Sequence, residues 1–363
     1  MVACRREAGE GDKARVTSPL TGAEMSLVSA ALGKPWRGRT QPSGPRPVSL
    51  LWARVRRGAS RQTSVLVLAT ILMSGVALLY EFSGGAPLLR ALPTSLAIGV
   101  GLAVVMSVIL ELSRNTVTSL ASLGKRAGYM VLGAAPELTP QALRELPPET
   151  RSPLGCLALQ PGSQFASAFR DLQSSIGKDR MVAFVGSVPN EGASTAALAA
   201  AVCAHQQGRR VLLVDCDLRR RSLTRTLVGE VEAGVLEAAN RPQGWRDLLH
   251  REAETGLHFM PAAKLKNPWN TLMGVQGFAS LLDEMRGGYE LIVLDCPPLL
   301  GSAEGTLLAR MADGCVVVTA WDDTPVGALR EGMRGLRDRP KGTTGVYVNR
   351  VPPGYRFGRL RPD

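Results

Sequence analysis

From about residue 162 the sequence alternates short apolar runs with helical patterns, and this alternation constrains the fold more than any other feature. The apolar runs are expected strands, at 181–186, 211–215, 257–261, 291–295, 314–319 and 345–349. The helical patterns are expected helices, at 193–207, 276–287, 303–312 and 325–337. Most strand runs are continuously apolar, as in a parallel sheet that is covered on both faces. We therefore predict an α/β fold with a doubly wound, mostly parallel sheet, whose ligand site lies at the carboxyl ends of the strands.

A loop with phosphate-binding character follows the first of these strands. The segment GSVPNEGAST at 186–195 leads into an Ala-rich helix that Gly208 closes. Backbone N–H groups at a helix N-terminus converge on an anion, and a hydroxyl there can ligate Mg²⁺. Gly192, Ser194 and Thr195 are therefore candidate nucleotide-binding residues, and Ser194 is also a candidate metal ligand. Such a turn is also ordinary capping chemistry, so the loop alone is a weak signal.

Carboxylates at two further strand ends strengthen the prediction. Asp215 and Asp217 stand in VLLVDCDLRR, and Asp295 stands in LIVLDCPP. Carboxylates beside a phosphate loop supply the hard oxygen ligands of Mg²⁺ and a base or water-positioning group. All three are candidate catalytic residues, and Asp215 and Asp295 are candidate metal ligands together with Ser194. The alternative is that they only cap helices.

The order VDCDLRR, LDCPP and VNR resembles the bacterial tyrosine kinases (BY-kinases) of capsule and exopolysaccharide systems, within the MinD/ParA-like P-loop group. The likeness covers about residues 110–350 and includes YMVLGAAPE at 129–137. It implies that Asp215 and Asp217 form the Walker A′ motif and Asp295 the Walker B motif. It also implies that Asn349 faces the adenine of ATP or ADP bound with Mg²⁺.

The sequence departs from the family in the phosphate loop. Ala193 stands where the resemblance requires the Walker A lysine, and 188–190 lacks the signature lysine of the MinD/ParA group. Losing one preorganised donor to developing charge costs on the order of 10²–10³ in rate. One of the arginines 219–221, which follow Asp217, is a candidate substitute cation.

Two other family features are incomplete. Ser167, Arg170 and Gln173 occupy the positions of E-x-x-R-x-x-R, which the family uses for ring assembly, so one of three residues is kept. Tyr355 stands alone where the family carries a C-terminal tyrosine cluster. The resemblance therefore implies impaired phosphotransfer and impaired assembly.

Two uncharged runs precede the α/β region, at 62–80 and 91–110. At 1.5 Å per residue, each is long enough for a hydrocarbon core of roughly 30 Å, so we expect a transmembrane hairpin with a ten-residue external loop. Residues 1–61 carry twelve basic and four acidic residues, and basic residues also follow the second run. By the positive-inside rule, both termini would be cytoplasmic in a multi-pass protein of the bacterial inner membrane. The membrane surface then explains the basic arm, so no nucleic-acid partner is expected.

The chain is accordingly divided into five parts. Residues 1–61 are an expected disordered basic arm, 62–110 the hairpin, 111–160 a Pro-rich cytoplasmic tether, 161–350 the P-loop domain and 351–363 a tail. Apolar residues make up 45% of the chain, which excludes a mostly disordered protein. The six cysteines form no C-x-x-C pair and only three histidines are present, so neither a disulfide framework nor a zinc module is indicated.

Three functions remain open on the sequence. The first is a membrane-anchored, BY-kinase-like nucleotide-binding protein that regulates polymerisation or export of exopolysaccharide or capsule and is catalytically impaired. The second is an active ATP-dependent tyrosine kinase or ATPase with a substitute cation. The third is a scaffold that binds no nucleotide and recruits a partner kinase or a chain-length regulator of the polysaccharide machinery.

Overall fold

The computed structural model describes residues 63–84, 93, 96–106, 116–118, 120, 123, 129–265, 267, 271–337 and 342–352. The α/β region is built on one eight-stranded sheet with the order β1-β8-β7-β2-β6-β3-β5-β4. The strands are β1 (Val131–Pro136), β2 (Met181–Gly186), β3 (Val211–Asp215), β4 (His250–Arg251), β5 (His258–Met260), β6 (Leu291–Asp295), β7 (Gly314–Ala320) and β8 (Thr344–Val351). All neighbours are parallel except the β4–β5 pair. The predicted mostly parallel α/β fold is confirmed.

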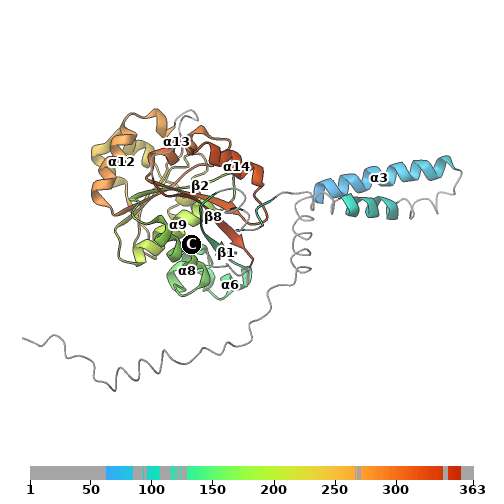
Figure 1. Cartoon of the computed structure of the whole chain (residues 1–363), viewed down its shortest axis with the longest axis horizontal. Helices are drawn as coiled ribbons and strands as arrows, with labels where there is room; N and C mark the ends of the chain where they lie inside the picture. Colours follow the sequence, from blue (N-terminus) through green and yellow to red (C-terminus); the bar gives the residue numbers. More distant parts are fainter. Residues whose placement is uncertain are drawn as a thin grey trace, which may run out of the picture. The chain divides into compact units, whose positions relative to one another are not determined.

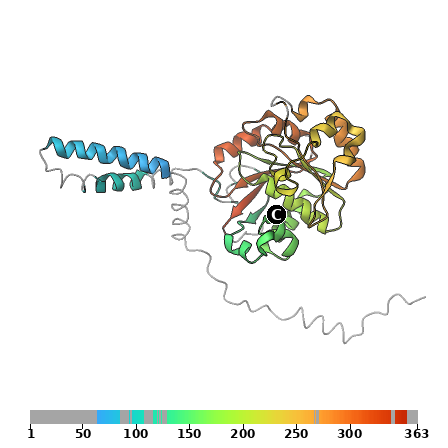
Figure 2. The ribbon, with the colours of Figure 1, turned by 180° about the vertical axis from the view of Figure 1, so that it is seen from behind.

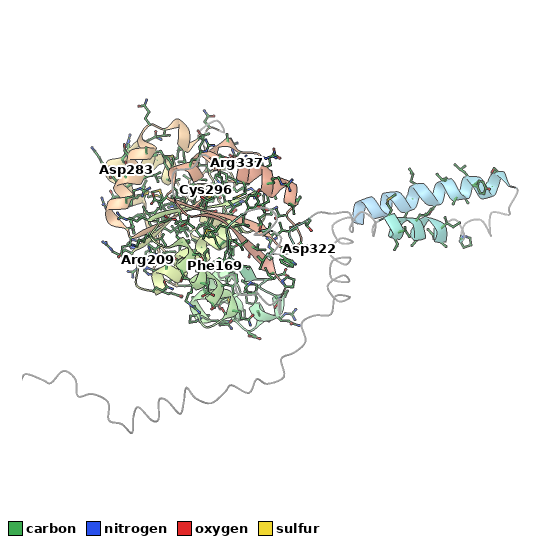
Figure 3. All side chains as sticks on the ribbon, in the orientation of Figure 1. Phe169, Arg209, Asp283, Cys296, Asp322 and Arg337 are labelled. Atoms are coloured by element: carbon green, nitrogen blue, oxygen red, sulfur yellow. The ribbon has the colours of Figure 1, made fainter. Side chains whose placement is uncertain are left out.

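Helices cover the two faces of this sheet (Figures 1 and 2). They are α6 (Pro140–Arg144), α7 (Pro153–Leu159), α8 (Gln164–Ile176), α9 (Ala193–Gln206), α10 (Ser222–Leu227), α11 (Val235–Asn240), α12 (Gly277–Gly288), α13 (Ala303–Met311) and α14 (Val326–Arg334). Short 3-10 turns lie at Pro148–Thr150, Pro242–Leu248 and Leu272–Gly274. One hydrophobic cluster includes residues of α7, α8 and α9, and the other includes residues of α11, α12 and α13. Phe169 lies in the first cluster and Cys296 in the second, both inside the domain (Figure 3).

The strands and helix nearest the site follow directly from composition. Every residue of β2, β3, β6 and β7 is buried, which is why their sequences are continuously apolar. In α9 all residues from Ala196 to Ala204 are buried, and most of them are alanines. Small side chains let this helix pack closely against the sheet. Its N-terminus lies near the carboxyl end of β2 because only residues 187–192 join the two elements.

The predicted start of the domain at residue 161 differs from the structure. β1 lies inside the expected tether 111–160, yet it pairs in parallel with β8 and buries Leu132 and Ala135. Helix α7 also buries four of its residues. β1 is an edge strand with register shifts, and its partner lies about two hundred residues further along the chain. Local sequence around its prolines therefore carries little sign of the pairing.

The N-terminal helices correct the membrane prediction. Helix α3 (Thr63–Ser83) and the helical residues 96–106 lie side by side, and a Cβ added at Gly99 would meet the Ser74 side chain (Figure 1). Among the residues that the structure describes, no helix has both the length and the apolar character needed to cross a bilayer. The expected location as a multi-pass inner-membrane protein is therefore wrong. The second run contains Pro93, and its described helical residues are 93 and 96–106.

Several expectations fall outside the described residues. These are the basic arm 1–61, most of the connection between the two uncharged runs, and the tail beyond residue 352 with Tyr355.

Candidate functional site

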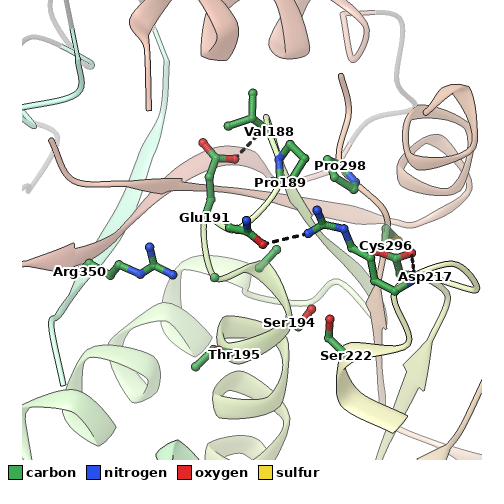
Figure 4. A pocket seen from close by; sticks show the side chains of 15 residues that line it. Val188, Pro189, Glu191, Ser194, Thr195, Asp217, Ser222, Cys296, Pro298 and Arg350 are labelled. Carbon is green, nitrogen blue, oxygen red and sulfur yellow. Dashed lines mark hydrogen bonds between the residues drawn. The ribbon is translucent and has the colours of Figure 1, made fainter. Parts of the chain in front are cut away.

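A cavity of about 340 Å³ opens where the carboxyl ends of the central strands meet the N-terminus of α9 (Figure 4). The predicted residues Gly192, Ser194, Thr195 and Asp217 line this cavity. The other lining residues are Gly186, Val188, Pro189, Asn190, Glu191, Ala193, Arg220, Ser222, Cys296, Pro298 and Arg350. The predicted residues Asp215, Asp295 and Asn349 are buried and are not among the lining residues. Four of the seven predicted site residues therefore line this cavity, and the other three are buried.

The loop is shaped for an anion. Gly192 has a φ of 90°, in the left-handed region, and no side chain caps the helix that begins at Ala193. The N–H groups of the first turn are therefore not held by a capping side chain, and the helix dipole points toward the cavity. A Cβ at Gly192 would lie 2.1 Å from Nδ2 of Asn349, so only glycine fits there. Ser194 and Thr195 add hydroxyls at the same edge (Figure 4).

Glu191, which the sequence analysis did not single out, holds the loop in place. Its Oε2 accepts a hydrogen bond from the Val188 N–H at 2.9 Å, and its Oε1 accepts one from the hydroxyl of Thr324. Burial raises the pKa of Glu191 to about 7. Thr324 follows β7, whose carboxyl end lies at the same edge of the sheet as that of β2. The position of Thr324 after an expected strand was the sequence signal that could have identified it as a site residue.

Asp215 and Asp295 occupy equivalent positions on β3 and β6, but their surroundings differ. Asp215 accepts hydrogen bonds from the Thr224 N–H at 3.0 Å, the Thr224 hydroxyl at 2.8 Å and the Asp217 N–H at 3.2 Å. Burial raises its pKa to about 6. Within the described part of the chain, neither carboxylate oxygen of the 1% exposed Asp295 has a hydrogen-bond partner.

The environment of Asp295 favours its neutral form strongly. Burial, and after it the charge of Asp215, raises the pKa of Asp295 well above its usual range. The Ser194 hydroxyl is near enough to favour the ionised form, but its geometry makes no hydrogen bond to either oxygen. An unpartnered buried carboxylate beside a phosphate-type loop fits a bound cation, because burial of an unpaired charge is otherwise costly.

Mg²⁺ is the cation that these donors fit. Asp295, Asp215 and the Ser194 hydroxyl offer hard oxygens, and Mg²⁺ commonly takes one or two carboxylates together with phosphate oxygens and water. No group of three or more His, Cys, Asp or Glu side chains suited to a metal occurs among the described residues. Two carboxylates and one hydroxyl suit a metal that takes its remaining ligands from phosphate and water.

Asn349 supports the loop rather than lining the cavity. Its Nδ2 donates to the carbonyl of Glu191 at 3.1 Å, and its Oδ1 accepts from the Arg350 N–H at 2.9 Å. Both ends of the amide are therefore used within the protein. Its contact with adenine stays a prediction of the resemblance.

The structure separates the three arginines that follow Asp217. Arg219 is exposed, and Arg221 forms a bidentate ion pair with Glu230 at 2.9 and 3.2 Å. Arg220 lines the cavity, and its Nη1 donates to Oδ1 of Asn190 at 3.3 Å. Arg350, which directly follows Asn349, is a second lining arginine that the sequence analysis did not consider.

No protein-family model matches the chain. Named relatives nevertheless confirm the resemblance to bacterial tyrosine kinases. The chain is 27% identical over 190 residues to EpsB of Ralstonia solanacearum, which covers 50% of this chain and 25% of EpsB. It is 28% identical over 186 residues to the tyrosine-protein kinase YwqD of Bacillus subtilis, covering 51% of this chain and 76% of YwqD. The succinoglycan biosynthesis transport protein ExoP of Rhizobium meliloti is 26% identical over 200 residues, covering 53% of this chain and 25% of ExoP.

Solved structures show the same fold. The kinase domain of the Escherichia coli tyrosine kinase ETK superposes with a TM-score of 0.59 at 17% identity, covering 68% of this chain and all of that domain. The BceF tyrosine kinase domain has a TM-score of 0.55 at 22% identity and covers 65% of this chain and all of that domain. The α/β region therefore has the fold of BY-kinase domains, whereas the match spans only about a quarter of EpsB and ExoP.

Proposed function

We propose that this chain binds a Mg²⁺-nucleotide, ATP or ADP, in the cavity and that it transfers phosphate poorly. In this proposal the bound nucleotide regulates polymerisation or export of an exopolysaccharide or capsule. One observation carries the proposal: the buried, unpartnered carboxylate of Asp295 lies beside a phosphate-type loop in which Ala193 replaces the lysine.

In this proposal, different residues of the site bind the phosphates and the metal. The first-turn N–H groups of α9 and the hydroxyl of Thr195 would hold the phosphates. Ser194, Asp215 and Asp295 would hold Mg²⁺, which when bound neutralises charge on the phosphate oxygens. Asp217 lines the cavity and is 6% exposed, which suits a group that positions a water or a nucleophile.

Impaired transfer follows from the side chain at position 193. Alanine presents a methyl group to the cavity, so no ammonium from the loop meets the charge that develops on the transferred group. The absence of one such donor corresponds to roughly 10²–10³ in rate. Binding is less affected, because Mg²⁺ and the helix amides still attract phosphate.

A second function, an active kinase or ATPase, is favoured by one observation. Arg220 lines the cavity, and its backbone N–H donates to Asp217, so a guanidinium is available in a cavity whose loop lacks the lysine. Partners are proposed from the relatives. ExoP is named as a succinoglycan biosynthesis transport protein, which suggests polysaccharide polymerisation or export machinery, with a partner kinase or a chain-length regulator as the specific contact.

The experiment is calorimetry with Mg-ADP and Mg-ATP on the full chain, followed by transfer of radiolabelled γ-phosphate. The variants are the natural chain, Ala193→Lys and the length-matched neutral control Ala193→Met. We expect weak binding and negligible transfer by the natural chain. We expect at least about tenfold tighter binding after Ala193→Lys, since charge-assisted hydrogen bonds are strong, and no gain after Ala193→Met. Robust transfer by the natural chain would favour the active enzyme, and no binding by any variant would favour the scaffold.

A further inference from the structure

Two arginines reach the cavity from segments that are far apart in sequence. Arg220 follows β3, and Arg350 lies within β8. They are the only basic residues among those found to line the cavity in the described part of the chain. In Figure 4 the Arg350 side chain lies across the loop from Asp217 and Ser222, with Ser194 between them. Positive charge therefore reaches the cavity from two sides.

Arg220 is held in place from both of its ends. Its backbone N–H donates to Oδ1 of Asp217 at 3.0 Å, and its carbonyl accepts a hydrogen bond from the Arg225 guanidinium. Its own guanidinium donates to Asn190, whose φ of 70° turns that residue into the left-handed region within the phosphate loop. One N–H of Arg220 Nη1 donates to Asn190, so the other N–H groups of the guanidinium remain for a ligand.

The backbone of Arg350 is fixed by a hydrogen bond, whereas its guanidinium is only weakly engaged. Its φ is 59°, and its N–H donates to the Asn349 side chain that also supports the phosphate loop. Its Nη1 lies 4.0 Å from Oδ2 of Asp323, and both of these side chains are about 40% exposed. An ion pair of this length and exposure contributes little to stability, so the guanidinium can turn to a stronger anion.

The neighbouring arginines do not share these properties. The Arg221 guanidinium is engaged by both carboxylate oxygens of Glu230, and Arg219 is exposed and is not among the lining residues. The cavity also contains Asp217 and Glu191, so a polyanion needs compensating cations to bind there.

We infer that Arg220 and Arg350 are the phosphate-binding cations of this site, in a loop that lacks the lysine. The ligand is a compound with a di- or triphosphate group, whose oxygens would be bound by two planar guanidinium groups instead of one ammonium. The inference rests on the proposed nucleotide function and specifies how that site recognises phosphate.

The test measures binding of Mg-ADP, Mg-ATP and inorganic tripolyphosphate to the full chain by calorimetry. Arg220→Ala should weaken binding at least about tenfold, and Arg350→Ala should weaken it about three- to tenfold. Arg219→Ala is the matched control, and we expect a change of less than about twofold because that side chain is exposed outside the cavity. Arg220→Lys should bind more tightly than Arg220→Ala and less tightly than the natural chain, because lysine keeps the charge but lacks the planar guanidinium. Thermal melting of each variant shows that it folds.

A second arm separates phosphate binding from a structural role. In the Ala193→Lys background the new ammonium competes for the same oxygens, so Arg220→Ala should cost about threefold or less. A purely structural role of Arg220 predicts the same loss in both backgrounds and would overturn the inference.

The outcomes distinguish the inference from the proposed function. If the natural chain binds nucleotide and both arginine variants match Arg219→Ala, the inference fails and the proposed function stands. If it binds tripolyphosphate through Arg220 but no nucleotide, the inference stands and the proposed function fails. If it binds none of the three probes, both fail.

Discussion

Asp215 and Asp295 are register partners on the neighbouring parallel strands β3 and β6, yet Asp215 accepts three hydrogen bonds and Asp295 accepts none from the described residues. Thr224 donates two of these hydrogen bonds and thereby fixes the Asp215 side chain at the end of β3. Asp295 keeps both oxygens available. The two carboxylates therefore differ in how available their oxygens are to a metal, and the first two predictions follow from this difference.

Asp295→Asn should stabilise the protein in the absence of Mg²⁺ and remove Mg²⁺-dependent nucleotide binding. The substitution removes a buried carboxylate that lies unpaired near a second acid. We expect the free energy of unfolding at pH 8 to rise, because ionising a buried carboxylate near a second acid is costly and asparagine carries no charge. Urea titration with and without Mg²⁺ checks this. Asp217→Asn is the control, and equal stabilisation by both variants would contradict the assignment.

Mg²⁺ should stabilise the protein more strongly as the pH rises. The pKa of Asp215 is raised from 3.8 to about 6, and that of Asp295 is also raised, so the folded state binds protons more tightly than the unfolded state. Without Mg²⁺ both groups therefore stabilise the fold at low pH. The contribution of Asp215 is lost as the pH rises through about 4 to 6, and that of Asp295 is lost from about pH 4 upward. Mg²⁺ needs the ionised carboxylates, so its effect has the opposite sign.

The measurement for this prediction is the melting temperature from pH 5 to pH 8, with Mg-ADP and with EDTA. The difference between the two curves should grow with pH, and it should be small and flat in Asp295→Asn. A constant difference in the natural chain would show that the carboxylates do not bind the metal.

Thr324→Val should destabilise the phosphate loop although valine has nearly the same shape. The Thr324 hydroxyl donates to Glu191 and accepts from the Ala320 N–H at 2.9 Å, and the side chain is 1% exposed. Its loss leaves two buried polar groups unpaired, which costs about 1–3 kcal/mol. Thr324→Ser keeps the hydroxyl and should retain nucleotide affinity. Urea unfolding and calorimetry of both variants test this, and equal loss in the two would indicate packing rather than hydrogen bonding.

Restoring the two missing residues of the ring motif should not restore a ring. Gln173 is 8% exposed, and its Nε2 donates to the Ala200 carbonyl of α9 at 2.9 Å, so position 173 faces inward. Gln173→Arg should therefore destabilise the domain by about 1–3 kcal/mol. Ser167→Glu, at a partly exposed position, should be nearly neutral. Light scattering of the natural chain and the double variant at micromolar concentration is the check, and a discrete ring-sized species in either would contradict the prediction.

The sequence by itself determined the central strands and the position of the loop between β2 and α9. Runs such as 181–186, 211–215 and 291–295 are continuously apolar because each is buried on both faces, and that requirement is visible locally. The same local reasoning failed at β1, whose partner β8 is distant in sequence, and at the two uncharged runs. Absence of charge is a local property, but spanning a bilayer also needs one long, continuous apolar helix.

Only the tertiary structure decided which polar groups act on the cavity. Three adjacent arginines are equivalent in sequence, but Glu230 engages Arg221 and Asn190 positions Arg220. Glu191 and Thr324 are 133 positions apart, and no local pattern links them. Burial is visible in composition because the residues that precede the carboxyl end of a covered strand are apolar. A hydrogen-bond partner is a single distant residue, so packing alone determines whether a carboxylate such as Asp295 is satisfied or remains available for a metal.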